Sequence, residues 1–530
     1  MTDTCPLCSS AVSPSTPPAP ISSEAEALLG TNNPPSEHAR HTFGVNLVDS
    51  ETRLEDVTGR IARLEESLRI LREEQSELNR AVQTYRKVLH PIRLLPQEVL
   101  YGIFSACIEP SGIMDTFLVQ GRPYQKDSLD PAKPPWTLAQ VSRAWRTAAI
   151  SYPSLWSYIG IQLPNSSTSE WHINRMAAQL MLQLQRSQLH SLTVSLRSEY
   201  NENHPRVDRL LLLICSHSAR WDTLRTWFWT TPIETFEAMS WMIKGNLPVL
   251  RRLYLEIGHH SQTGGTIDVF EFAPQLQDLM IWGRTAGLSD VLRLPWTQIT
   301  RFRGTSDKSE ARTSIDYDFL SKMMNLRELV EIRHFPPTIV ESETTLQLRS
   351  LQSLAIVAKE GSVLPSKVLD IITSDNLLDF RLDARTDPVS VARLLTRSSA
   401  TIRSLSLRLL GDINAAHVIR VLECVPRLTS LSLRQVSDEV IMALGEQSAS
   451  GKPRLLKDLE KLTLYAPCRI DGNILFAMAM ARAREPMTLC LDDNVTLQDD
   501  TRQELEGLRR QGLNFCRIKP KWSQALLEPY

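Results

Sequence analysis

The 530-residue sequence has little of what marks nucleic-acid-binding, membrane-spanning or secreted proteins. Its 59 Lys and Arg residues nearly balance its 60 Asp and Glu residues, so no excess of positive charge favours nucleic acid or an anionic membrane as the main partner. It has no apolar run of the length that spans a bilayer, and its N-terminus lacks the charged and apolar regions of a signal peptide. We therefore expect a soluble protein of the cytoplasm or nucleus, with no membrane partner.

The sequence also lacks the motifs of common enzymes. Gly-x-Ser-x-Gly, His-Glu-x-x-His and a second Cys-x-x-Cys are absent. The loop from Gly445 to Lys452 is similar to a phosphate-binding loop, but it has one residue too many between its glycines, and Pro453 stands where Ser or Thr should bind magnesium. We expect no catalytic residues, no cofactor and no enzymatic activity. A hydrolase or nucleotide-binding protein with an unrecognised site stays as a third hypothesis.

The eight cysteines are scattered along the chain, and inside a cell such residues are more often buried thiols than disulfides. Cys5 and Cys8 have the spacing of half a zinc site, but the next candidate ligands, His38 and His41, lie too far along for a small zinc finger. We therefore expect no bound metal. Residues 1–50 are rich in Pro, Ser, Thr and Ala and have little apolar periodicity, which predicts a disordered tail.

Residues 51–90 have a different pattern, in which apolar residues recur at alternating steps of three and four. This seam consists of Leu54, Val57, Ile61, Leu64, Leu68, Leu71, Leu78, Val82, Tyr85 and Leu89, with Gln75 at one position. The pattern predicts a coiled-coil helix that ends before Pro91. Gln75 is the one polar seam residue, and a buried amide there influences register or partner choice. The seam fits two partners, a second copy of the chain or the chain's own C-terminal part.

Two short amphipathic segments follow within residues 92–159. The first runs from Leu94 to Phe104, and Pro96 suits the first turn of its helix. The second runs from Leu138 to Trp145. The intervening residues 109–135 are rich in Pro and Gly and predict a loop insertion. The two helices are too short to bury their apolar stripes alone, so we expect them to pack on each other, and an ordinary helical hairpin of a larger domain is one interpretation.

These residues resemble the F-box, a helical module that binds a Skp-family adaptor and so joins a protein to a cullin–RING ubiquitin ligase. The pattern Leu-Pro-x-Glu-x-Leu-x-x-Ile-Phe from Leu95 to Phe104, and Val-x-x-x-Trp from Val141 to Trp145, match the family motif. The segment from Pro153 to Trp156 is similar to the extended form of large fungal F-box families. The resemblance implies adaptor contacts at the motif positions Leu95, Pro96, Leu100, Ile103, Phe104, Val141 and Trp145.

Residues 185–530 contain an internal repeat of the form Leu-x-x-Leu-x-Leu. Clear copies begin at Leu250, Leu276, Leu351, Leu377, Ile402, Leu428 and Leu459, with weaker copies elsewhere. Successive starts between residues 250 and 428 lie 23 to 27 residues apart, which is the period of a leucine-rich repeat. Each copy predicts a short strand followed by a helix, and the last strand is predicted at Leu513 to Ile518. The alternative is an independent α/β domain with coincidental spacing.

The predicted fold is therefore an α/β protein, in which a helical F-box with an internal loop precedes an irregular leucine-rich-repeat solenoid. Residues between the buried Leu positions of each strand face the opposite way and line a concave face. We predict substrate contacts there at Tyr254, Trp282, Arg381 and Arg408, because aromatic and Arg side chains are frequent at interface hot spots.

The function expected from these features is that of a non-catalytic substrate-recognition subunit of an SCF-type cullin–RING ubiquitin ligase. The F-box would bind the Skp-family adaptor and cullin complex, and the repeats would bind an unidentified protein substrate. The alternative is a protein-interaction scaffold that uses the coiled coil and the repeats without any role in a ligase.

Overall fold

The computed structural model divides into two units, Met1–Val99 and Leu100–Tyr530, which we describe separately. It describes residues 20–108, 127–165, 167–198, 207–228, 232–257, 265–283, 285, 287–305, 317–335, 345–359, 363–398, 401–409, 414–449, 451–466, 470–482, 487–495, 499–508 and 512–518. Within these ranges, no helix has both the length and the apolar character needed to cross a membrane.

The first unit is dominated by one long helix. Helix α1 (Ser23–Leu29) is followed by α2 (Glu37–Val88) and by the 3-10 helix η1 (Pro91–Leu94). The 52 residues of α2 make it about 78 Å long at about 1.5 Å per residue. The hydroxyl of Ser36 accepts a hydrogen bond from the backbone N–H of Ala39 and caps the start of α2. The helix ends before Pro91, as the sequence predicts.

The predicted disordered tail of residues 1–50 is wrong in its second half, because α1 and the first turns of α2 lie there. The reason is local: Ser36 supplies a helix cap, and no proline interrupts the chain between Ser36 and Pro91. The helix that the seam predicts therefore starts well before residue 51. Residues 1–19, which include Cys5 and Cys8, lie outside the described residues.

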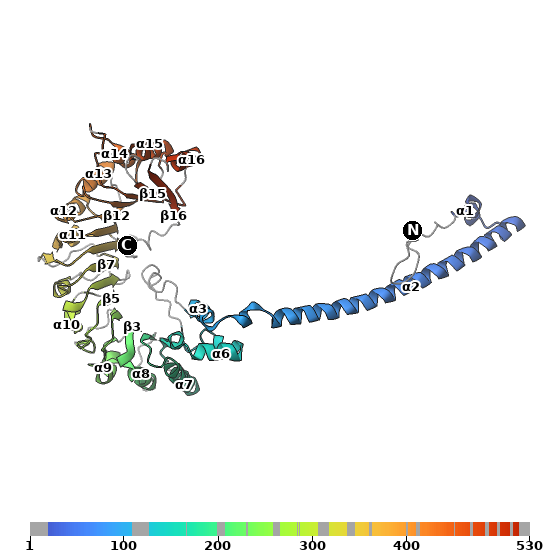
Figure 1. Ribbon diagram of the computed structural model, residues 1–530, viewed down its shortest axis with the longest axis horizontal. Helices are drawn as coiled ribbons and strands as arrows, with labels where there is room; N and C mark the ends of the chain where they lie inside the picture. The colour runs from blue at the N-terminus through green and yellow to red at the C-terminus, as the bar shows by residue number, and fades with distance from the viewer. Residues whose placement is uncertain are drawn as a thin grey trace. The chain divides into compact units, whose positions relative to one another are not determined.

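The second unit is a mixed α/β structure built on one large parallel sheet (Figure 1). Its N-terminal part, which we call the helical module, consists of α3 (Gln97–Ile108), α5 (Leu138–Val141), α6 (Arg143–Ile150) and the 3-10 helix η2 (Pro153–Trp156). Helix α3 begins in the last residues of the first unit.

Fourteen strands form the large sheet, and each pairs in parallel with the next along the chain. They are β1 (Tyr158–Gln162), β2 (Leu192–Ser198), β3 (Trp221–Phe228), β4 (Arg252–Ile257), β5 (Asp278–Gly283), β6 (Arg301–Thr305), β7 (Glu328–Arg333), β9 (Ser353–Ala358), β11 (Asp379–Ala384), β12 (Ser404–Leu409), β13 (Ser430–Arg434), β14 (Lys461–Tyr465), β15 (Met487–Asp492) and β16 (Leu513–Ile518). Two further short strands, β8 (Leu346–Gln347) and β10 (Ile372–Thr373), pair with each other.

The remaining helices of this unit lie in the connections between strands, along the outer side of the curved sheet (Figure 1). They are α7 (Glu170–Arg186), α8 (Val207–Cys215), α9 (Pro232–Ile243), α10 (Leu288–Val291), α11 (Ser366–Ile371), α12 (Pro388–Ser398), α13 (Ala415–Glu423), α14 (Asp438–Gly445), α15 (Gly472–Arg482) and α16 (Asp499–Gly507), with the 3-10 helices η3 (Ser218–Arg220), η4 (Trp296–Gln298) and η6 (Asp318–Lys322). Between β5 and β8 the described connections contain only the short helix α10 and the 3-10 helices η4 and η6. The sequence predicts a helix after every strand, and in this region the described residues show only these short turns.

The repeat pattern predicts the strands well. In all seven clear copies, the last two apolar residues fall in a strand, and β16 has the predicted bounds. Equivalent residues stand in register, as Leu253 does with Leu279 and Leu405 with Leu431, and all four are buried under the helices. The sheet starts earlier than residue 185, however, because the buried Ile159 of β1 already belongs to it.

Candidate protein-interaction surfaces

Two large aromatic side chains hold the helical module together. The Phe104 ring of α3 is fully buried and lies 5.0 Å, centroid to centroid, from the Trp145 ring of α6. Leu100, one turn before Phe104, is also buried. Leu100 and Phe104 were predicted as adaptor contacts, but both are buried and belong to the core of the module. They lie on the apolar face of α3, and Phe104 on that face packs on Trp145 of α6.

The other predicted adaptor residues remain accessible. Ile103 is 38% exposed and Val141 is 61% exposed, whereas Trp145 is half-buried. In the first unit, Pro96 is exposed and Leu95 is half-buried. These residues are therefore accessible to a partner, although single exposed apolar side chains are common on protein surfaces.

The helical module is firmly attached to the beginning of the sheet. The indole N–H of Trp156 in η2 donates to the carbonyl of Ala149 at 2.8 Å, and the Arg186 guanidinium of α7 lies 4.3 Å from the Trp156 ring centroid. Burial lowers the pKa of Arg186, and the neighbouring charge of Arg146 lowers it further. The Gln183 amide of α7 donates to the carbonyl of Tyr158 at 2.6 Å, which fixes α7 on β1. Aromatic packing and satisfied buried hydrogen bonds make this a rigid junction.

The predicted concave-face contacts occupy the expected face of the sheet, but most are inaccessible. Tyr254, Trp282 and Arg381 are each less than 5% exposed, and Arg408 is half-buried. Adjacent strands lie about 4.8 Å apart, so large side chains in register cover one another. The Trp227 and Trp282 rings lie 5.4 Å apart in an apolar cluster on this face. The prediction that Tyr254, Trp282 and Arg381 are exposed contacts is therefore wrong.

The charged side chains of this face neutralise one another. Arg303 lies 3.7 Å from Asp278 and 3.2 Å from Glu328, and both of its partners come from neighbouring strands. Burial raises the pKa of the Asp278 carboxyl, although Arg303 and Arg301 lower it in part. Arg408 pairs with Asp383 in the same way. This face is thus an internal network of ion pairs and not a free recognition surface.

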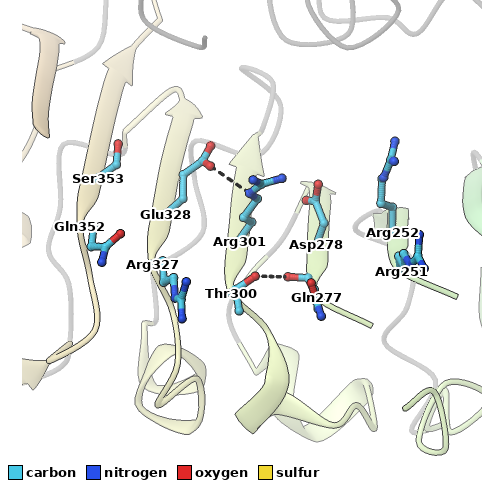
Figure 2. Close-up of a pocket in the computed structure, with 10 residues that line it drawn as sticks. All are labelled: Arg251, Arg252, Gln277, Asp278, Thr300, Arg301, Arg327, Glu328, Gln352 and Ser353. Atoms are coloured by element: carbon cyan, nitrogen blue, oxygen red, sulfur yellow. Dashed lines mark hydrogen bonds and ion pairs between the residues drawn. The ribbon is translucent and has the colours of Figure 1, made fainter. Parts of the chain in front are cut away.

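A more accessible surface lies at the edge where the strands begin. A groove of about 660 Å³ lies there. Figure 2 shows the side chains that line it, which are Arg251, Arg252, Gln277, Asp278, Thr300, Arg301, Arg327, Glu328, Gln352 and Ser353. In it the Arg301 side chain lies between Asp278 and Glu328 and pairs with Glu328 at 3.4 Å. A second groove of about 600 Å³ at the same edge is lined by Arg403, Arg427, Thr429, Lys452, Pro453, Lys457, Asp458, Leu459 and Glu460.

The alternation of residues inside the strands does not predict this edge, because its outer residues stand just before the strands. The signal that could have found it is an Arg or Gln just before the strand in several repeats, as at Arg251, Gln277, Arg327, Gln352 and Arg403.

One further polar cluster is buried on the helix-covered side of the sheet. Glu331 and Arg333 of β7 form an ion pair of 2.6 Å, and Arg333 donates to the Thr285 hydroxyl at 3.1 Å. Gly304 of β6 leaves room for them, because a Cβ atom there would lie 2.5 Å from a Glu331 carboxylate oxygen. Burial, assisted by Glu331, raises the pKa of the Tyr317 phenol. The cluster is closed off from solvent.

Five cysteines lie in the described part of the chain, and all are free thiols. Cys215 is buried, and burial raises its pKa to about 12. The adjacent histidines His259 and His260, which could in principle bind a metal, lie outside the described residues. Within the described ranges, no three His, Cys, Asp or Glu side chains are placed to hold a metal ion.

Comparison with known proteins finds no protein-family model that matches the chain and no curated protein that matches it significantly.

Proposed function

We propose that this protein is a non-catalytic substrate receptor of an SCF-type cullin–RING ubiquitin ligase. In this proposal the helical module is an F-box that binds a Skp-family adaptor, and the sheet is an irregular leucine-rich-repeat domain that binds the protein to be ubiquitinated. The proposed mechanism is proximity: the receptor raises the effective concentration of a substrate lysine near the charged conjugating enzyme, and other subunits carry out the chemistry.

The main support for the adaptor role is the match of the motif to the F-box pattern, together with the accessibility of two of its apolar residues, Ile103 and Val141. Phe104 and Trp145 from the same motif pack against each other and join α3 to α6. In this proposal their packing would hold the accessible motif residues in place for the adaptor.

Co-purification with a Skp-family adaptor tests the proposal. The intact chain should retain the adaptor, and a Leu95→Ala, Pro96→Ala double variant should lose it, because these residues begin the motif and are accessible or half-accessible. Unchanged thermal unfolding of the variant would establish that it is still folded. Retention of the adaptor by this variant, or failure of the intact chain to bind it, would contradict the proposal.

The second candidate is a dimeric scaffold without a ligase role, and the exposed seam of α2 favours it. Leu54, Ile61 and Leu78 are each more than half exposed in the single chain. An apolar seam of this length is expected to pair with another helix, and we infer that its partner is a second copy of the chain. Dimerisation through α2 does not exclude adaptor binding by the helical module. Adaptor binding distinguishes the two candidates, because only the ligase receptor requires it.

A further inference from the structure

The strand-start edge carries two parallel rows of side chains with different charge patterns. The inner row contains the first residues of the strands from β4 to β7, and it alternates in sign: Arg252, Asp278, Arg301 and Glu328. The outer row contains the residues just before the strands, linked by backbone hydrogen bonds from one strand to the next. It consists of Arg251, Gln277, Thr300, Arg327, Gln352, Leu378 and Arg403.

Between Arg251 and Arg403 the outer row contains no acidic residue, although the same ladder of backbone hydrogen bonds continues to Asp222 on one side and through Thr429 to Glu460 on the other. Its three cations, Arg251, Arg327 and Arg403, recur at every third strand of the sheet. At about 4.8 Å between strands, neighbouring cations of this row stand about 14 Å apart. The residues between Arg251 and Arg327 are polar and uncharged, so they can form hydrogen bonds with amide groups.

The cations of the outer row differ in how far they are neutralised. Arg251 lies 3.6 Å from Asp222, and Arg403 donates to the carbonyl of Arg427. Arg327 is exposed and has no carboxylate partner among the described residues, although it lies in the centre of the row. The row therefore has at its midpoint a solvent-exposed cation that no carboxylate of the described residues neutralises.

We propose that the outer row binds an extended segment of a partner protein whose Asp or Glu side chains recur about every fourth residue. An extended chain advances about 3.3 Å per residue, so four residues cover about 13 Å, which matches the spacing of the cations. Arginine forms bidentate hydrogen bonds with carboxylates, and Gln277, Thr300 and Gln352 are placed to contact the intervening peptide groups. The proposal deepens the proposed function, because it rests on the sheet holding a partner protein.

The same geometry disfavours nucleic acid. Each strand of a nucleic-acid duplex presents a charge about every 3.4 Å, which is much denser than the spacing of the outer-row cations.

Fluorescence anisotropy with the full-length protein tests this site. The probe is a labelled peptide with three Glu residues separated by three-residue Gly and Ser spacers, and the comparison peptides carry Gln for Glu, or the three Glu residues side by side. The spaced Glu peptide should bind best, and its affinity should fall as salt increases.

Two protein variants test the position of the site. Arg327→Glu should weaken this binding at least about tenfold, whereas Arg420→Glu, at an exposed position on α13, should not. Replacing the central Glu of the peptide by Lys should restore binding to the Arg327→Glu variant, which also establishes that this variant is folded.

Equal binding of the Gln peptide, or an unchanged affinity of the Arg327→Glu variant, would overturn the proposal. Binding of a phosphoserine version or of single-stranded DNA in place of the Glu peptide would also overturn it, since the ligand would then be phosphate.

Adaptor co-purification, measured on the same preparations, separates this site from the proposed ligase role. Loss of the adaptor with retained peptide binding contradicts only the ligase role, and loss of peptide binding with retained adaptor contradicts only this site.

Discussion

Two adjacent residues of α3 separate stability from binding in the helical module. Phe104 is fully buried against Trp145, whereas the side chain of Ile103 reaches solvent. Substitutions at the two positions should therefore have different effects, although both belong to the same sequence motif.

We predict that Phe104→Ala lowers the free energy of unfolding by about 3–5 kcal/mol, because it leaves a cavity under Trp145. Ile103→Ala should lower it by less than about 1 kcal/mol, since the site is partly exposed. Urea unfolding followed by tryptophan fluorescence measures both. Equal losses for the two variants would mean that the packing of this helix is different.

The buried carboxyl of Glu331 makes stability depend on pH. Burial raises its pKa in the folded protein, and this outweighs the opposing effect of Arg333. The folded protein then binds this proton more tightly than the unfolded chain does, so the contribution of Glu331 to stability is present at low pH and is lost as pH rises through the raised pKa.

We therefore predict that Glu331→Gln removes this pH dependence. The unfolding free energy of the wild type, relative to the variant, should decrease as pH rises above 4.5, the ordinary pKa of a Glu carboxyl. The exposed Glu237→Gln serves as a control and should produce no such trend. A wild type that gains stability over the Glu331→Gln variant as pH rises would show that the sign is wrong.

At this scale, the sequence identifies which face a residue occupies but not whether the face is free. The alternation in β4 and β5 places Tyr254 and Trp282 on the side away from the helices, as predicted. It could not predict that neighbouring rows, including Trp227, would bury them, because that depends on contacts between residues far apart in the chain. The buried pair Glu331 and Arg333 was missed because it lies at positions where the repeat normally has apolar residues.

At the scale of elements, the period of about 25 residues was sufficient to predict the strands, because each strand must place its Leu residues in the same core. Connections were predicted less well, since the helices are short or replaced by 3-10 turns between β5 and β8. The N-terminal start of α2 does not follow from composition, because residues 1–50 are rich in the residue types of disordered tails. The start depends on the local cap at Ser36.

Helix α2 provides a prediction of its own. We expect the full chain to sediment as a dimer, and Leu71→Glu to raise the dissociation constant at least about tenfold, because Leu71 lies in the seam. The neighbouring Ile70 is similarly exposed but lies outside the seam, so Ile70→Glu should leave the dimer intact. A monomeric wild-type chain at micromolar concentration, or equal effects of the two variants, would rule out this pairing.

At the scale of the whole molecule, we propose three separate tasks for three parts of one chain. The seam of α2 would pair two copies, the helical module would bind the adaptor, and the strand-start edge of the sheet would bind the partner protein. The junction of Trp156, Arg186 and Gln183 makes the helical module and the first strands continuous, so a partner held on the sheet would be held at a defined position relative to α5 and α6.

The measurement that tests the central claim most directly is the affinity of the purified full-length protein for a Skp-family adaptor, by isothermal titration calorimetry. We predict binding by the wild type and a loss of at least about a hundredfold in an Ile103→Asp, Val141→Asp double variant, because both exposed apolar contacts would become charged. Val389→Asp, at a similarly exposed apolar position on α12, should bind like the wild type. No binding by the wild type, or equal binding by the double variant, would contradict the claim that the helical module is an adaptor-binding F-box.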